Sequence, residues 1–292
     1  MINKIKGELL NFGLKFISVD EKIVRILLET SPSNVNEIVI LPAVKTVMKK
    51  LVKKLQNKIK HGRVYNGILN GVRVSVILSN VGCPNVAMIL ECLKRCKTKV
   101  IVRVDLCGAI SKQEGEVSIG DILIPELVYC GDGTTPQYIR SYGTLITFLD
   151  SIKNPLLTTQ NIEVGNQSIY ISKPDEALRE IVLKSGRSLP NCDIKAVDFW
   201  TTDALFCETL EFIRALQSIN VRGIDMESSI LFLLGSLFNL KTVSVLSVTD
   251  LPGHPEYDLL MSNQIHPNME NGIDKAIKIV VNALPKIKTL IN

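Results

Sequence analysis

Two acidic residues stand at the start of a helix that is otherwise apolar. In the string GIDMESSILF, Asp225 and Glu227 flank Met226, and the apolar run follows directly. Two more polar residues stand at the ends of strand-like runs, Arg103 in KVIVRV and Asp250 in KTVSVLSVTD. Carboxylates accept hydrogen bonds and transfer protons, and arginine binds oxyanions. Because ligands of open α/β sheets gather at the carboxyl ends of strands, these side chains form one candidate site.

Each of these residues also has a purely structural interpretation. Asp225 could cap the helix, and Glu227 suits a first helical turn, where the helix dipole favours acids. Arg103 could form an internal ion pair, and Asp250 could cap the turn that Pro252 begins. Residue types and spacing alone leave both interpretations open.

An alternation of strand-like and helix-like runs must position these residues. The dipeptide Asn70-Gly71 between two β-rich runs predicts a hairpin over residues 63–78. Apolar patterns predict further strands at 99–104, 120–129 and 241–250, and helices at 84–96, 176–186, 228–240 and 271–287. We expect Gly186 to end its helix. This order favours an α/β fold with helices on both faces of a largely buried sheet.

Composition excludes several classes of protein. The chain has 292 residues, 46% hydrophobic, and a net charge of +5. The lysines cluster only at 45–60, without interleaved aromatics, which predicts a solvated helix face rather than a nucleic-acid groove. Seven cysteines without a CxxC pair and three histidines predict no metal site. No apolar run reaches the ~18 residues of a membrane span, and no export signal is visible, so we expect a cytoplasmic protein.

Five stretches, in order along the chain, match the motif order of a known family. They are YNGILNGVRVSVILSNVGCPN, VRVDLCGAI, GDILIPELVYCGDGTTPQY, FWTTDALFCETLEF and GIDMESSILFLLGSLFNLKTVSVLSVTD. With their flanks they resemble the nucleoside phosphorylase family, which contains purine nucleoside phosphorylases, uridine phosphorylases and related nucleosidases. The resemblance covers about Ile38 to Asp250. It implies a single domain over residues 1–292, a three-layer α/β sandwich with a central mixed, partly barrel-like sheet.

The resemblance implies a reaction and a role for each residue. The reaction is cleavage of the N-glycosidic bond of a ribonucleoside by phosphate, giving the free base and ribose 1-phosphate. Glu227 is expected to accept hydrogen bonds from the ribose hydroxyls, with Met226 against the ribose. Asp225 is expected to order the segment or to contact the edge of the ribose. Asp250 is expected to share a proton with the leaving base, which favours a purine over uridine. The loop beside the base pocket adds two expected substrate contacts, Phe206 and Thr202.

The expected phosphate ligands are Arg103, with Lys45 nearby and Lys60 lent by a neighbouring subunit or replaced by Arg63. Inorganic phosphate is the co-substrate, and no other cofactor is expected. Family members act as oligomers, so the expected partner is a second copy in a dimer-based assembly up to a hexamer, or a paralogue. No nucleic acid or membrane partner is expected.

The phosphate motifs depart from the family pattern. Ala43 and Val47 stand where the first phosphate loop has glycine and arginine, and Leu205 replaces an aromatic of the base loop. In the strand motif Arg-x-Gly-Ser/Thr-x-Gly, Asp105 replaces a glycine and Leu106 replaces the phosphate-binding hydroxyl. Asp105 therefore adds a negative charge where a dianion should bind.

These departures leave several functions open. One is a nucleoside phosphorylase with a rebuilt phosphate site, acting on a purine nucleoside or, alternatively, on uridine. Another is a nucleoside hydrolase that uses Asp105 as its base. A third is a non-catalytic nucleoside-binding subunit of a hetero-oligomer. In each case Arg103, Glu227 and Asp250 are expected to converge on one pocket.

Overall fold

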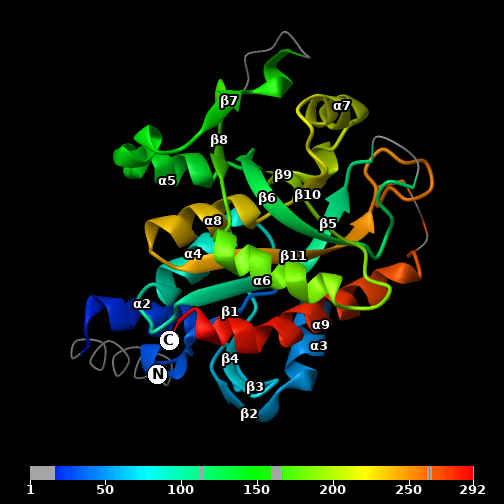
Figure 1. Ribbon diagram of the computed structural model, residues 1–292. Coiled ribbons are helices and arrows are strands. Elements are labelled where there is room, and N and C mark those ends of the chain that lie inside the picture. Colours follow the sequence, from blue (N-terminus) through cyan, green and yellow to red (C-terminus); the bar gives the residue numbers. More distant parts are fainter. Residues whose placement is uncertain (1–16, 112–114, 159–165, 262, 264, 292) are drawn as a thin grey trace, which may run out of the picture.

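The computed structural model describes residues 17–111, 115–158, 166–261, 263 and 265–291 (Figure 1). The strands are β1 Ile38–Ile40, β2 Gln56–His61, β3 Val64–Leu69, β4 Val72–Ile77, β5 Val100–Ala109, β6 Ile122–Cys130, β7 Ser151–Lys153, β8 Ser168–Ser172, β9 Ile194–Thr201, β10 Gly223–Asp225 and β11 Lys241–Asp250. The helices are α2 Val19–Leu28, α3 Lys45–Lys54, α4 Cys83–Leu93, α5 Thr135–Ser141, α6 Glu176–Arg187, α7 Leu210–Ser218, α8 Ser228–Leu237 and α9 Asn268–Thr289. Short 3₁₀ turns, η1 Pro32–Asn34, η2 Gly143–Thr147, η3 Pro155–Thr158 and η4 Leu205–Cys207, join them.

The centre of the sheet closes on itself. Strand β5 pairs with β10, β10 with β9, β9 with β6, β6 with β11, and β11 again with β5. Strands β1, β4, β3 and β2 extend the sheet beyond β5, and β8 and β7 extend it beyond β6. Parallel and antiparallel pairs both occur in the ring. The expected mixed, partly barrel-like sheet is therefore confirmed.

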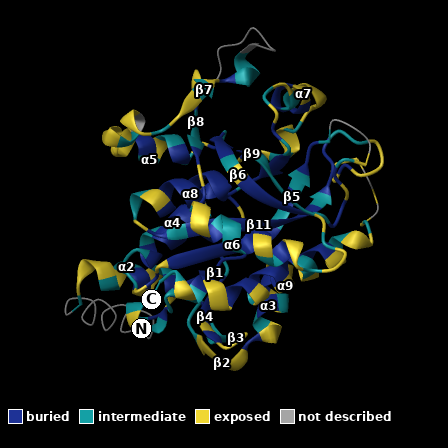
Figure 2. Ribbon diagram, viewed as in Figure 1, coloured by how far each residue is buried: buried dark blue, intermediate teal, exposed yellow. Residues whose placement is uncertain are grey.

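Two apolar cores lie on the two sides of this sheet. One contains buried side chains of α2, α4 and α8, and the other contains those of α3, α6 and α9. Helix α8 packs on β11 and α4 packs on α8, while α9 packs on β11 and α6 packs on α9. The central strands are buried, and α2, α6 and α9 carry exposed residues (Figure 2). The expected three-layer arrangement is therefore confirmed. Among the described residues, no helix is long and apolar enough to cross a bilayer.

The strongest local patterns were predicted correctly. Asn70 and Gly71 have φ of 46° and 76°, as a type I′ turn requires, and they join β3 to β4. The strand predicted at 241–250 has the bounds of β11. The helices predicted at 84–96 and 228–240 are α4 and α8.

Two predictions about local structure were wrong. Gly186 does not end its helix, because α6 continues to Arg187. It is instead a packing position, since a Cβ there would lie 2.3 Å from Ile194 Cδ1. The lysine-rich run 45–60 is a helix face only as far as Lys54, where α3 ends. Its second half is β2, an exposed strand at the end of the sheet order.

Gly223 tests the packing that closes the ring. A Cβ at this position would lie 2.3 Å from Phe199 Cζ, on the neighbouring strand β9. We expect Gly223→Ala to lower the free energy of unfolding by about 1–3 kcal/mol, because the core must shift to admit a methyl group. Guanidinium unfolding curves measure this change. Gly143→Ala is the matched control, because nothing lies within 4 Å of the added Cβ. Equal midpoints for the two variants would contradict the packing argument.

Candidate active site

Residues from three parts of the barrel line one cavity of about 200 Å³. Strand β5 supplies Arg103 and Asp105, the β10–α8 junction supplies Met226 and its flanking acids, and the end of β11 supplies Asp250. The expected convergence of Arg103, Glu227 and Asp250 on one pocket is therefore confirmed. The other lining residues are Ala43, Val44, Val81, Leu106, Cys107, Gly108, Leu205, Glu208, Ile224, Thr249 and Leu259.

Arg103 is buried and held by acids. Its Nη1 donates to Asp225 Oδ2 at 2.6 Å and to Ser228 Oγ at 3.2 Å, and its Nη2 donates to Glu227 Oε2. Burial opposes its positive charge, yet Glu227, Asp225 and Asp105 together raise its pKa. The structural interpretation of Arg103 as an internal ion pair is therefore correct, and it holds alongside its place in the cavity.

The junction between β10 and α8 fixes both carboxylates of the ion pair. Asp225 accepts hydrogen bonds from the Thr201 hydroxyl at 2.6 Å and from the Ser228 N–H at 3.0 Å. It therefore provides a partner for a backbone N–H in the first turn of α8, which has no partner within the helix. Glu227 occupies the N-cap position of α8 without capping it. Its Oε1 instead accepts the N–H of Gly82 at 2.8 Å. Gly82 has φ of 99°, a conformation that glycine adopts readily.

Asp105 contacts two groups that the family resemblance associates with phosphate. Its Oδ2 accepts the backbone N–H of Ala43, in the segment that resembles the first phosphate loop of the family. The same oxygen lies 3.8 Å from Arg103 Nη2. Burial raises the pKa of Asp105, and Arg103 opposes that shift. Groups expected to bind phosphate are thus already occupied by a side chain of the protein.

Two acids lie at the end of the cavity formed by β11 and η4. A bulge between Val248 and Asp250 interrupts the β11 ladder just before Asp250, and burial raises the pKa of Asp250 to about 6. Glu208 follows η4, and burial, reinforced by Asp250 and Asp258, raises its pKa to about 8. Sequence reasoning missed Glu208, because only its place in the cavity wall distinguishes it from other glutamates.

Four residues expected at the site do not line the cavity. Phe206 is 84% exposed, while its neighbour Leu205 lines the wall. The hydroxyl of Thr202 accepts the Ala204 N–H at 3.2 Å. Lys45 is exposed at the start of α3, and the Lys60 ammonium lies 5.2 Å from the ring centroid of Tyr65 on β3. Arg63, the alternative to Lys60, donates to the carbonyls of Leu27 and Leu78. The expected roles of these residues in binding stay predictions.

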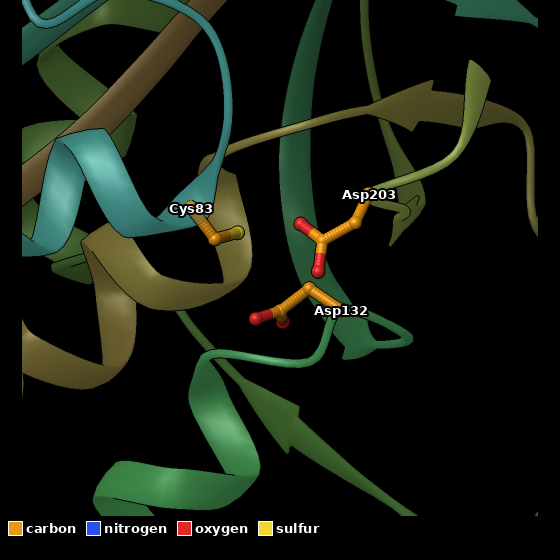
Figure 3. A group of neighbouring side chains, drawn as sticks. All are labelled: Cys83, Asp132 and Asp203. Atoms are coloured by element: carbon orange, nitrogen blue, oxygen red, sulfur yellow. The ribbon is translucent and has the colours of Figure 1, made fainter. Parts of the chain in front are cut away.

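A second group of polar side chains lies beside Gly82. Cys83, Asp132 and Asp203 come from α4 and two loops and point toward one another (Figure 3), with potential ligand atoms within 4.8 Å of each other. Asp132 accepts the N–H groups of Thr134 and Thr135 and the hydroxyl of Ser229, and Asp203 accepts the N–H of Gly133.

Chemistry gives this group a structural role. Burial, reinforced by Asp132, raises the pKa of the Cys83 thiol well above its usual range. Its Sγ lies 3.3 Å from the Met226 carbonyl oxygen and 3.4 Å from Ser229 Oγ. The group therefore fastens the start of α4 and the loops after β6 and β9 to the segment that carries Glu227.

The sequence and the fold agree with a known family. Residues 37–285 match the family model of the phosphorylase superfamily, and the chain belongs to this family. A solved uridine phosphorylase from Vibrio fischeri superposes with a TM-score of 0.69 at 19% identity, covering 88% of this chain and 95% of that one. A purine nucleoside phosphorylase from Toxoplasma gondii gives a TM-score of 0.68 at 15% identity, covering 90% and 96%.

Curated relatives are similar at low identity. A DeoD-type purine nucleoside phosphorylase from Brevibacillus brevis is 25% identical over 179 residues, which are 61% of this chain and 63% of the relative, less than two thirds of its length. A guanosine phosphorylase from Halorubrum lacusprofundi is 21% identical over 214 residues, covering 72% and 75%. The resemblance to the nucleoside phosphorylase family is confirmed, and the base specificity differs among these similar proteins.

The raised pKa of Glu208 predicts a pH-dependent stability. The folded protein binds this proton more tightly than the unfolded chain, whose glutamate pKa is 4.5. The resulting stabilisation is complete below that value and is lost as the pH rises toward 8. We expect Glu208→Gln, which carries no charge, to raise the melting temperature relative to the parent near pH 8, and the difference to vanish near pH 4.5. Glu211→Gln, at an exposed position of α7, is the control. A pH-independent difference for Glu208→Gln would contradict the assignment.

Proposed function

We propose that this protein cleaves the N-glycosidic bond of a purine ribonucleoside. One observation carries the proposal: one cavity holds Glu227, whose carboxylate is paired with the Arg103 guanidinium, and Asp250, whose pKa is raised by burial to about 6. Burial also raises the pKa of Glu227, to about 7, and the Arg103 charge opposes that shift and favours the hydrogen-bond-accepting carboxylate. Cleavage of this bond develops positive charge on the ribosyl ring and negative charge on the base. A hydrogen-bond acceptor at the sugar stabilises the positive charge, and a proton donor at the base neutralises the negative charge.

Glu227 retains the capacity to bind ribose. Each carboxylate oxygen has two lone pairs, and each accepts a single hydrogen bond, one from Gly82 and one from Arg103. A further lone pair on each oxygen is available for ribose hydroxyls. Its fixed orientation supports positioning of the sugar at little entropic cost.

The acids at the other end support a purine. A carboxyl with a pKa of about 6 is partly protonated near neutral pH, so Asp250 can donate to the imidazole edge of a leaving purine. Glu208, in contact with the same cavity, adds a second donor in its protonated form. Uracil has no imidazole edge, which is why uridine is the less favoured substrate.

Two forms of the reaction differ in the acceptor of the ribosyl group. Phosphorolysis is supported by family membership and by Arg103 in the cavity wall. Hydrolysis is supported by Asp105, which holds the Ala43 N–H in place of a phosphate oxygen. Both forms release the same base, so cleavage itself is tested independently of the acceptor.

A product assay tests the cleavage. Inosine, adenosine, guanosine and uridine are incubated with the protein, with and without phosphate, and the free base is quantified by chromatography. We expect release from at least one purine nucleoside and slower release from uridine. Asp250→Asn should slow purine release by about 10²–10⁴-fold, because an amide cannot transfer the proton. Uridine cleavage faster than that of every purine would reverse the base assignment.

Glu227→Gln tests the sugar end. Loss of a charged acceptor for the ribose should weaken binding or turnover by ~1.5–3 kcal/mol, or about 10–150-fold. Calorimetric titration and initial rates measure the two effects separately. A variant that binds and cleaves nucleosides like the parent would remove Glu227 from the site. The matched control is Glu211→Gln, which changes an exposed glutamate.

A further inference from the structure

The β5 wall of the cavity carries an unsatisfied donor and an unsatisfied acceptor. Arg103 Nε and Asp105 Oδ1 are buried without a well-formed hydrogen bond among the described residues. The two residues are two positions apart on one strand, so their side chains leave the same face of the sheet. Buried polar atoms without partners are rare in native proteins. A water molecule, which both accepts and donates, suits such a pair.

We propose that Asp105 is the general base for a water nucleophile, so that the protein hydrolyses its nucleoside substrate instead of transferring ribose to phosphate. This inference rests on the cleavage proposed above and identifies water as the acceptor of the ribosyl group. It assigns a catalytic role to a residue that the family pattern does not contain.

A phosphate ion meets few free donors in this cavity. The Ala43 N–H is donated to Asp105, and the two Nη atoms of Arg103 are held by Asp225 and Glu227. Among the lining residues that the structure describes, Arg103 is the sole basic side chain, against five carboxylic acids. Leu106 adds an apolar wall where the family pattern has a hydroxyl. A dianion would therefore enter a site of its own sign, whereas a neutral water molecule would not.

The reaction balances with water alone. Asp105 takes one proton from water, and the water oxygen bonds to C1′ of the ribose. The bond between C1′ and the base nitrogen breaks, and its electron pair leaves with the base. Asp250 gives its proton to the base, and the proton on Asp105 then returns to solvent while Asp250 is reprotonated. The products are ribose and free base, with no oxidant, reductant or metal required.

The environment of Asp105 supports proton transfer. Burial raises the pKa of its carboxyl, which makes the carboxylate a stronger base than one in water, and Arg103 keeps the charged form accessible. Its Oδ2 is fixed by Ala43, and the Leu106 backbone lies beside the carboxyl, so Oδ1, which has no well-formed hydrogen bond among the described residues, is the oxygen left to take a proton. The alternative is that Asp105 only anchors the Ala43 segment, and the test separates the two.

The first experiment asks whether the unsubstituted protein needs phosphate to cleave nucleosides. Nucleosides are incubated in phosphate-depleted buffer and in buffer with added inorganic phosphate, and the sugar product is identified by phosphorus NMR and a reducing-sugar assay. We expect free ribose at the same rate in both buffers and no ribose 1-phosphate. Cleavage only with phosphate would overturn the role of water and leave the proposed cleavage intact. No cleavage in either buffer would overturn both.

The variant Asp105→Asn then tests whether Asp105 acts as the general base. The amide oxygen can still accept the Ala43 N–H, so an anchoring role is preserved, but the amide cannot take a proton. We expect hydrolysis to fall by about 10²–10⁴-fold, with nucleoside affinity and melting temperature close to those of the parent. Hydrolysis within a few-fold of the parent would overturn the role. Asp274→Asn, at an exposed carboxylate paired with Lys50, is the control and should leave hydrolysis unchanged.

A second variant tests whether Asp105 and Leu106 prevent phosphate from binding at the β5 wall. Asp105→Gly combined with Leu106→Ser restores the family pattern by removing a charge and an apolar wall and adding a hydroxyl donor. We expect phosphate affinity, measured by calorimetric titration, to rise by about tenfold or more. A parent that already binds phosphate tightly, or a double variant that binds it more weakly, would show that Asp105 and Leu106 belong to a rebuilt phosphate site.

Discussion

The buried guanidinium of Arg103 is the charge on which the rest of the site depends. Moving an unpaired charge into a protein interior costs several kcal/mol, and only well-placed partners offset that cost. Asp225 and Glu227 supply them from a junction more than a hundred residues away in sequence. The positions of both acids are therefore set by the arginine as much as by any ligand. This reciprocity explains why the same residues form a structural ion pair and also line the cavity.

The closed ring of strands makes this pairing possible. Strand β5 meets β10 on one side and β11 on the other, so the arginine, the β10–α8 junction and the end of β11 can line one cavity. An open sheet would place these elements along an edge, where neighbouring strands lie ~4.8 Å apart. Closure also shields the guanidinium from bulk solvent, which strengthens its interactions with the carboxylates. Burial in the same place raises the pKa of Glu227 to about 7 and also raises that of Asp105.

Local patterns allowed most of the fold to be predicted, and long-range contacts account for what was missed. The turn at Asn70 and the apolar run of β11 carry their structure in their own residues. The motif around Glu227 identified the family and the cavity. By contrast, the burial of Glu208 and the bond from Ala43 to Asp105 arise only when distant segments meet, 62 residues apart in the latter case. The strand β2 was hidden because its exposed lysines follow without a break from those of α3.

The edge strand β2 has a consequence for how copies of the chain meet one another. A strand at the end of a sheet offers unpaired backbone groups to any other extended chain, and this is a common route to aggregation. Here the strand is interrupted by a bulge between Gln56 and Ile59, where Asn57 has φ of 49°. Lys58 and Lys60 place positive charge along it. Two copies brought edge to edge would align these lysines against each other, so the sheet resists growing from one molecule into the next.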